Sequence, residues 1–92
     1  MQGNEKPLIN PFAVLREEFD DWAVLFNPDT AEAVGLNPIG VTLWRRMDGT
    51  RTVSELVSYV RGAYAGVPET ADADIADFVA DLADRGFVGF AQ

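Results

Sequence analysis

The apolar residues of this 92-residue chain change their spacing once, at Asn37-Pro38. Before that point they come in short runs separated by turn-forming residues, as in β-strands. After it they recur every three or four residues, as on the buried side of an amphipathic helix. A single change of period restricts the chain to an α+β fold, with the strands first and the helices after them.

Three runs in the first part predict an antiparallel three-stranded sheet, at Phe12–Phe19, Trp22–Phe26 and Ala31–Leu36. The acidic pair Asp20-Asp21 separates the first two runs, and the turn Asn27–Thr30 separates the last two, since Pro, Asn and Asp favour turns. The second run is apolar along nearly its whole length, which suits a central strand. The third run mixes Ala, Glu and Gly, which suits an edge strand.

The second part predicts three helices. Asn37-Pro38 starts the first, with Asn as N-cap and Pro at the first helical position, and Asp48-Gly49 ends it. Thr52 and Glu55 form a capping box for the second helix, which stops at Gly66–Pro68. The third helix begins near Thr70 or Asp72 and ends at Gly86, and a short extended segment can follow it.

The third helix divides into three stripes at 100° per residue. The predicted core stripe holds Ile75, Phe78, Val79 and Leu82, and an exposed acidic stripe holds Asp74, Asp77, Asp81 and Asp84. A third stripe holds Ala76, Ala80 and Ala83. These alanines either fill a neutral side of a good helix or leave a shallow channel in which another backbone can approach closely.

The composition excludes most catalytic chemistry. The chain has no Cys and no His, which rules out disulfides, thiolate nucleophiles, the usual zinc sites, iron–sulfur ligation and His-based general bases. We therefore expect no enzyme activity, no metal and no cofactor. A net charge of −8 argues against binding to nucleic acid, whose affinity comes from Lys and Arg.

The ends and the length of the chain set its expected context. No stretch is long and apolar enough to span a membrane, and the polar start Met1–Pro7 does not resemble an export signal. We therefore expect a single cytoplasmic domain over residues 1–92, with residues 1–9 flexible. An exposed edge strand permits either a monomer or a strand-exchanged dimer.

The ordered set of motifs resembles the PqqD-like family. The resemblance rests on Leu36–Gly40 (LNPIG), on Met47–Val53 (MDGTRTV), and on Asp74, Ile75, Phe78, Leu82 and Gly86 in the last helix, so it spans nearly the whole chain. The run Pro11–Leu36 further resembles the PqqD-like member of the SynChlorMet gene cassette, which also encodes two radical SAM enzymes.

The resemblance implies a winged helix-turn-helix-like fold of three strands and three helices, and a recognition element for ribosomally made, modified peptides. In such domains the leader of a precursor peptide adds as a strand beside the third strand, in the groove next to the third helix. The adaptor carries no cofactor and presents the peptide to a modifying enzyme, commonly of the radical SAM/SPASM type.

The residues are compatible with that role, because strand addition needs an exposed edge with free backbone groups. We predict a peptide-binding site made of Ala31, Glu32, Ala33, Val34, Gly35, Leu36, Ala76, Val79, Ala80 and Ala83. Trp22 and Trp44 are expected to pack in the core, as large aromatic residues do in small domains.

Two other functions are compatible with a small acidic domain. A winged-helix DNA-binding regulator would need a basic recognition helix, whereas the third helix is the most acidic element. A small acidic carrier domain would need an Asp-Ser-Leu type attachment site, and neither Ser54 nor Ser58 lies in one.

Overall fold

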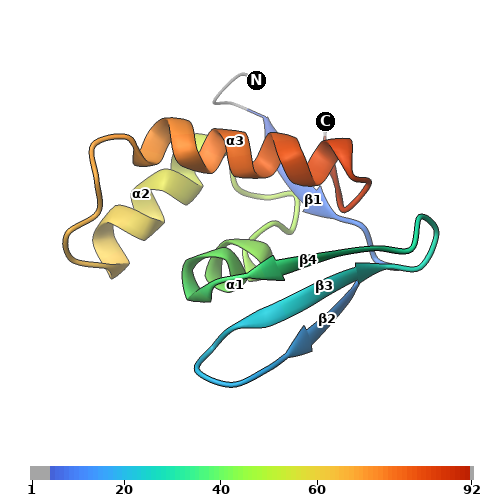
Figure 1. Ribbon diagram of the computed structural model, residues 1–92. Helices are drawn as coiled ribbons and strands as arrows, with labels where there is room; N and C mark the ends of the chain where they lie inside the picture. Colours follow the sequence, from blue (N-terminus) through green and yellow to red (C-terminus); the bar gives the residue numbers. More distant parts are fainter. Residues whose placement is uncertain (1–4, 92) are drawn as a thin grey trace.

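The computed structural model describes residues 5–91, which form five strands and three helices. Their bounds are β1 (Lys6–Ile9), β2 (Val14–Glu17), β3 (Ala23–Asn27), β4 (Glu32–Leu36), α1 (Pro38–Arg45), α2 (Val53–Ala63), α3 (Ala71–Asp84) and β5 (Val88–Ala91). Strands β2, β3 and β4 form an antiparallel sheet in that order, and β1 pairs with β5 in a separate antiparallel ribbon. The α+β class, with a three-stranded sheet and three helices, is confirmed (Figure 1). The winged-helix likeness stays a prediction.

The ribbon of β1 and β5 includes part of the segment 1–9 that was expected to be flexible. Residues 1–4 lie outside the described part of the chain, but Lys6–Ile9 is a strand with Pro7 buried. The Ile9 amide donates to the Met47 carbonyl at 2.9 Å, and the Gly49 amide donates to the Pro7 carbonyl at 3.0 Å. The partners that order this strand lie far along the sequence, so no local pattern signals it.

The turns of the sheet depend on left-handed backbone conformations. Asp20 and Asp21 have φ of 57° and 63° and connect β2 to β3, which suits Asp because its short polar side chain tolerates this region. Ala31 has φ of 62°, so it belongs to the turn before β4 and not to the predicted strand. β2 is shorter at both ends than the predicted Phe12–Phe19, and β3 has the predicted length but begins and ends one residue later than Trp22–Phe26.

The helix caps follow the sequence signals. The Asn37 side chain accepts from the Gly40 amide at 2.8 Å, and Thr52 and Glu55 form both bonds of the capping box. One boundary differs, because α1 ends at Arg45 and not at Asp48-Gly49. Asp48 instead forms an antiparallel β-bridge with Leu8 of β1, so the backbone at this position pairs with a strand and does not continue the helix.

The core lies between the sheet and the helices. It includes Leu25 and Leu36 from the sheet, Trp44 from α1, Leu56 from α2 and Leu82 from α3. Trp44 packs in the core as expected and is 4% exposed, but the same expectation is wrong for Trp22, which is 51% exposed. Within residues 5–91, no helix has the length and apolar character that crossing a membrane requires.

Candidate functional site

The sheet has two edge strands, β2 and β4, and β4 is the one that lies next to α3 (Figure 1). The Glu18 amide donates to the Trp22 carbonyl at 2.7 Å, so the backbone groups of Trp22 point toward β2. Backbone groups alternate in direction along a strand, so those of Ala23, Leu25 and Asn27 in β3 point toward β4. The Asn27 carbonyl accordingly accepts from the Ala31 amide on that side, at 2.8 Å.

This alternation identifies the backbone groups that β4 leaves unpaired in the sheet. The β3 residues that point toward β4 pair in register with Leu36, Val34 and Glu32. The residues between them, Ala33 and Gly35, therefore turn their N–H and C=O groups away from β3. Both are small and exposed, and α3 runs beside this edge (Figure 1). The edge can accept a further strand.

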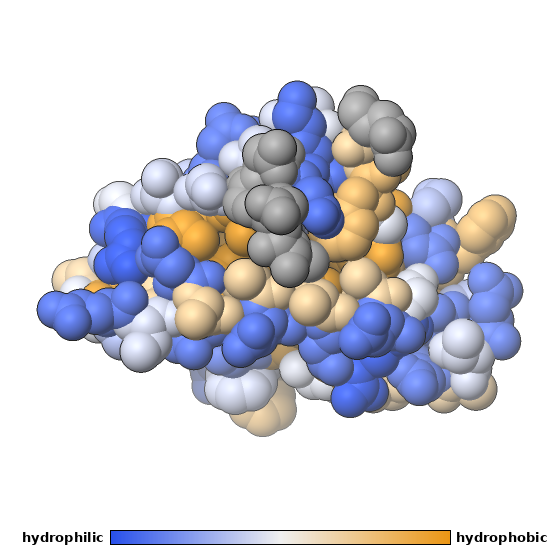
Figure 2. Space-filling view, turned by 90° about the horizontal axis from the view of Figure 1, so that it is seen from above, coloured by the Kyte–Doolittle hydropathy of each residue, from blue (hydrophilic) through white to orange (hydrophobic). Residues whose placement is uncertain are grey.

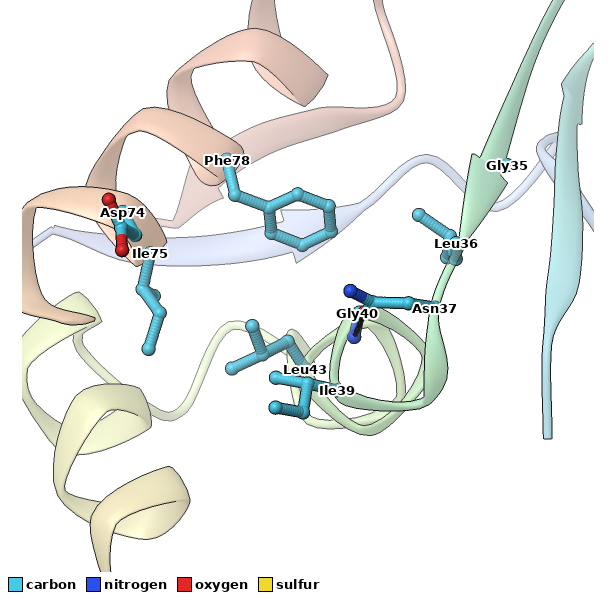
Figure 3. Close-up of a pocket in the computed structure, with 9 residues that line it drawn as sticks. All are labelled: Gly35, Leu36, Asn37, Ile39, Gly40, Leu43, Asp74, Ile75 and Phe78. Carbon is cyan, nitrogen blue, oxygen red and sulfur yellow. Dashed lines mark hydrogen bonds between the residues drawn. The ribbon is translucent and has the colours of Figure 1, made fainter. Parts of the chain in front are cut away.

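A groove lies between this edge and the third helix, and we call it the β4–α3 groove. It encloses about 270 Å³ and is lined by Gly35, Leu36, Asn37, Ile39, Gly40, Leu43, Asp74, Ile75 and Phe78. In Figure 3, Phe78 extends from α3 toward Leu36, and Ile75 extends toward Leu43 and Ile39. The volume lies just below the ~300–1,000 Å³ of pockets for drug-sized ligands, so the groove suits apolar side chains better than a cofactor.

A second apolar hollow continues the β4–α3 groove past the start of α3. It encloses about 250 Å³ and shares Ile39, Asp74 and Ile75 with the groove. Its far wall is the segment between α2 and α3, which includes Val67 and Pro68. An extended chain that follows β4 could therefore continue along an apolar path.

The opposite end of α3 is joined to the sheet by polar contacts. Arg85 lies 3.6 Å from Glu32 of β4 and 3.0 Å from Asp81. The hydrogen bond and charge of Asp81, with the charge of Glu32, raise the pKa of Arg85 above its ordinary value. The buried Asn27 side chain donates to the Arg85 and Gly86 carbonyls at 3.3 and 3.4 Å. These contacts hold α3 at a fixed place along β4.

The surface above α3 is mainly hydrophilic. Figure 2 looks down on this side and shows polar side chains with smaller apolar patches between them. Asp74, Asp77, Asp81 and Asp84 are all exposed, as the acidic stripe predicted. Asp74 accepts from the Thr70 hydroxyl at 3.0 Å and lies on the wall of the groove.

The structure brings together only part of the predicted site. Glu32, Ala33, Val34, Gly35 and Leu36 form β4. The backbone of Leu36 pairs with β3, and its buried side chain is part of the groove lining. Ala31 lies in the turn before β4.

The α3 residues of the predicted site lie away from the groove. Val79 is fully buried in the core, and Ala76, Ala80 and Ala83 do not line the groove. Ala76 and Ala80 are each two residues from Phe78, which at 100° per residue sets them about 160° away around the helix. The neighbouring Asp72 pairs with Arg61 of α2 at 2.6 Å, so this side of α3 faces α2.

Seven groove residues lie outside the predicted site: Asn37, Ile39, Gly40, Leu43, Asp74, Ile75 and Phe78. Phe78 was assigned to the core, where it packs only in part. A signal existed, because Phe78 and Asp74 lie four residues apart and so share one side of the helix. No pattern in the sequence showed which side of α3 faces β4.

The described residues contain no group of three or more metal-ligating side chains. The groove has one carboxylate, Asp74, among mainly apolar neighbours. Its chemistry is that of a surface that binds apolar side chains and an extended backbone.

Comparisons with known proteins give a family match and two solved structures of similar fold. A family profile described as Coenzyme PQQ synthesis protein D (PqqD) matches residues 23–88. No curated protein matches the chain. A solved structure described as "TbiB1 in Complex with the TbiA(beta) Leader Peptide" has a TM-score of 0.73 and 26% identity, over 92% of this chain and 99% of that one. Another, "Lasso peptide synthetase B1 complexed with the leader peptide", has a TM-score of 0.73 and 19% identity, over 91% of this chain and 98% of that one, and shows likeness of fold.

Proposed function

This chain belongs to the PqqD family, and we propose on that basis that it is an adaptor for a ribosomally synthesised precursor peptide. The leader of the peptide pairs with β4 as a fourth strand and places apolar side chains in the β4–α3 groove. The adaptor then presents the rest of the peptide to a modifying enzyme.

The observation that carries the proposal is the position of the unpaired backbone groups of Ala33 and Gly35 beside an apolar groove. Backbone pairing supplies affinity for an extended peptide, and pockets for its side chains supply specificity. The similar solved structure with 26% identity is described as a complex with a leader peptide, which supports the same use of the fold here.

We extend the proposal to the catalytic activity, the cellular compartment and the partner enzyme. The adaptor has no catalytic activity and works in the cytoplasm, and its enzyme is of the radical SAM/SPASM type, as in the SynChlorMet cassette that the sequence resembles. The acidic α3 surface disfavours the alternative of a DNA-binding regulator, because phosphates would meet four exposed aspartates.

The proposal is tested by isothermal titration with the leader of the precursor peptide encoded beside this chain, for which we expect micromolar or tighter binding. Ala33→Pro should weaken binding by about tenfold or more, because proline removes the outward N–H while an edge strand tolerates it there. Ala33→Val is the matched control, since it keeps the N–H and should bind as the wild type does.

Circular dichroism should show that both variants are folded. If folded Ala33→Pro binds the leader as tightly as Ala33→Val, the peptide does not pair with this edge. If the wild type binds none of the leaders encoded nearby, the adaptor function itself is contradicted.

A further inference from the structure

The side of the β2-β3-β4 sheet that faces away from the core carries large apolar side chains. We call it the outer sheet face; by register it comprises Val14, Arg16, Val24, Phe26, Ala33 and Gly35. Val14 is 53% exposed and Phe26 is 41% exposed, and Trp22 extends the patch at the start of β3. An antiparallel sheet with one side on the core ordinarily has polar residues on the other. A contiguous exposed apolar patch marks an interaction surface.

Two adjoining hollows shape this face. One encloses about 320 Å³ between Val14, Arg16, Val24 and Phe26. The other encloses about 380 Å³, and its lining includes Phe19, Trp22, Val24 and Gly35. The first is joined to the second by Val24, and the second is joined to the β4–α3 groove by Gly35. The apolar surface therefore runs from the outer sheet face to the edge that we assign to the leader.

The glycine at this junction is not required by the fold. A Cβ built on Gly35 would meet no atom within 4 Å, and the residue is not in the left-handed region. Glycine inside a strand weakens it and often marks a place where a ligand or another backbone approaches closely. The open space over Gly35 is thus available to a partner.

The charges around the patch indicate the kind of partner. Glu18, Asp20 and Asp21 are exposed beside the hollow that contains Trp22. Arg16, the basic residue of the outer sheet face, lies 3.5 Å from Glu18 and so is paired within the chain. A second copy of this acidic chain, packed face to face, would bring like charges together, whereas an apolar surface with a basic rim is complementary.

We propose that the outer sheet face is the docking surface for the modifying enzyme, which contributes an apolar patch with basic residues around it. This proposal rests on the proposed function. A leader strand added beside β4 extends the same face, since alternate side chains of the added strand stand next to Ala33 and Gly35. The enzyme then contacts the sheet and the leader together, so it binds the adaptor–leader complex more tightly than the adaptor alone.

The test uses the double variant Val14→Thr with Phe26→Thr in the full chain. Threonine favours strands, and both positions face solvent, so the sheet is preserved. Two affinities are measured: that for the leader, by isothermal titration, and that for the purified modifying enzyme encoded with the chain, by biolayer interferometry. We expect enzyme affinity to fall by about tenfold or more and leader affinity to stay unchanged.

The matched control is Tyr59→Thr on α2, because Tyr59 is also aromatic and is 38% exposed. It should leave both affinities at the wild-type level. Unchanged enzyme affinity in the double variant would overturn the proposal. Loss of leader affinity in that variant would also overturn it, and would assign the face to the peptide.

A third contrary outcome concerns self-association. If sedimentation shows a wild-type dimer that the double variant converts to a monomer with enzyme affinity unchanged, a second copy covers the face. A wild type that binds no leader would contradict the proposed function, while the affinity of the enzyme for the adaptor alone would still decide the role of the outer sheet face.

Discussion

The Glu55 carboxylate accepts a hydrogen bond from the Thr52 amide at 2.9 Å and closes the N-terminus of α2. This bond, with that to the Thr52 side chain, lowers the pKa of Glu55 below its ordinary value of 4.5. The unfolded chain therefore binds the proton at a higher pH than the folded chain does. The carboxylate stabilises the fold above pH 4.5, and this contribution is lost as the pH falls through the folded pKa.

We expect Glu55→Ala to unfold at a lower temperature than the wild type at pH 7, because the capping box loses its second bond. The gap between their Tm values should narrow as the pH falls below 4.5, where the wild-type carboxylate also becomes protonated. Thermal melts followed by circular dichroism from pH 7 to pH 3 measure this. Ser54→Ala, an exposed neighbour, should show no such pH dependence, and a constant gap for Glu55→Ala would contradict the assignment.

Single residues were predictable where their role depends on near neighbours in sequence. Asn37, Thr52 and Glu55 cap helices as expected, because a cap needs only a residue three positions away. Trp22 was not predictable in this way. It lies just before β3, on the same side of the strand as Val24 and Phe26, which face away from the core.

At the scale of elements, α3 uses different sides for different purposes. Leu82 and Val79 point into the core, Phe78 and Asp74 line the β4–α3 groove, and Asp72 pairs with Arg61 of α2. The hydrophobic period predicted the core side correctly. The period does not show which of the residues next to the core side lie toward β4. That depends on how the helix packs against a strand some 40 residues earlier.

This division predicts separate effects for two substitutions in α3. Phe78→Ala should weaken leader binding by about tenfold or more, since an aromatic side chain is lost from the groove. Leu82→Ala should instead lower the free energy of unfolding by about 2–5 kcal/mol, as expected for a fully buried leucine. Titration with the leader and urea denaturation measure the two effects.

Ala80→Leu distinguishes the groove from the alanine stripe that the sequence suggested. Ala80 lies on the opposite side of α3 from Phe78, so enlarging it should leave leader affinity unchanged in a folded protein. If Ala80→Leu weakens binding as much as Phe78→Ala does, the leader lies along the alanines.

At the scale of the whole molecule, the ribbon of β1 and β5 joins the two ends of the described chain. Lys6 pairs with Ala91, and Ile9 pairs with Val88. The Asn10 amide adds a bond to the Phe87 carbonyl at 2.8 Å. The sequence suggested an extended tail after the third helix and gave no partner for it, because a pairing between residues this far apart leaves no local signal.

Deleting residues 1–9 should therefore destabilise the domain as a whole. The deletion removes the buried Pro7 and the partly buried Ile9, and it leaves the backbone of β5 unpaired. We expect the free energy of unfolding to fall by about 2–4 kcal/mol, at about 1.5–3 kcal/mol for each fully buried apolar side chain. Urea denaturation measures this, and an unchanged midpoint would show that β1 contributes nothing to stability.

The ribbon also suits the domain to insertion into another protein and to circular permutation. Since the described chain enters and leaves at paired residues, Lys6 and Ala91, a host protein could carry the domain in one of its surface loops without separating the two sides of that loop. A circular permutant with a short linker between the present ends, and new ends in the segment between α2 and α3, would keep β4 and its neighbours in one uninterrupted stretch. The two paired strands that form this closure contribute no residue to the lining of the β4–α3 groove.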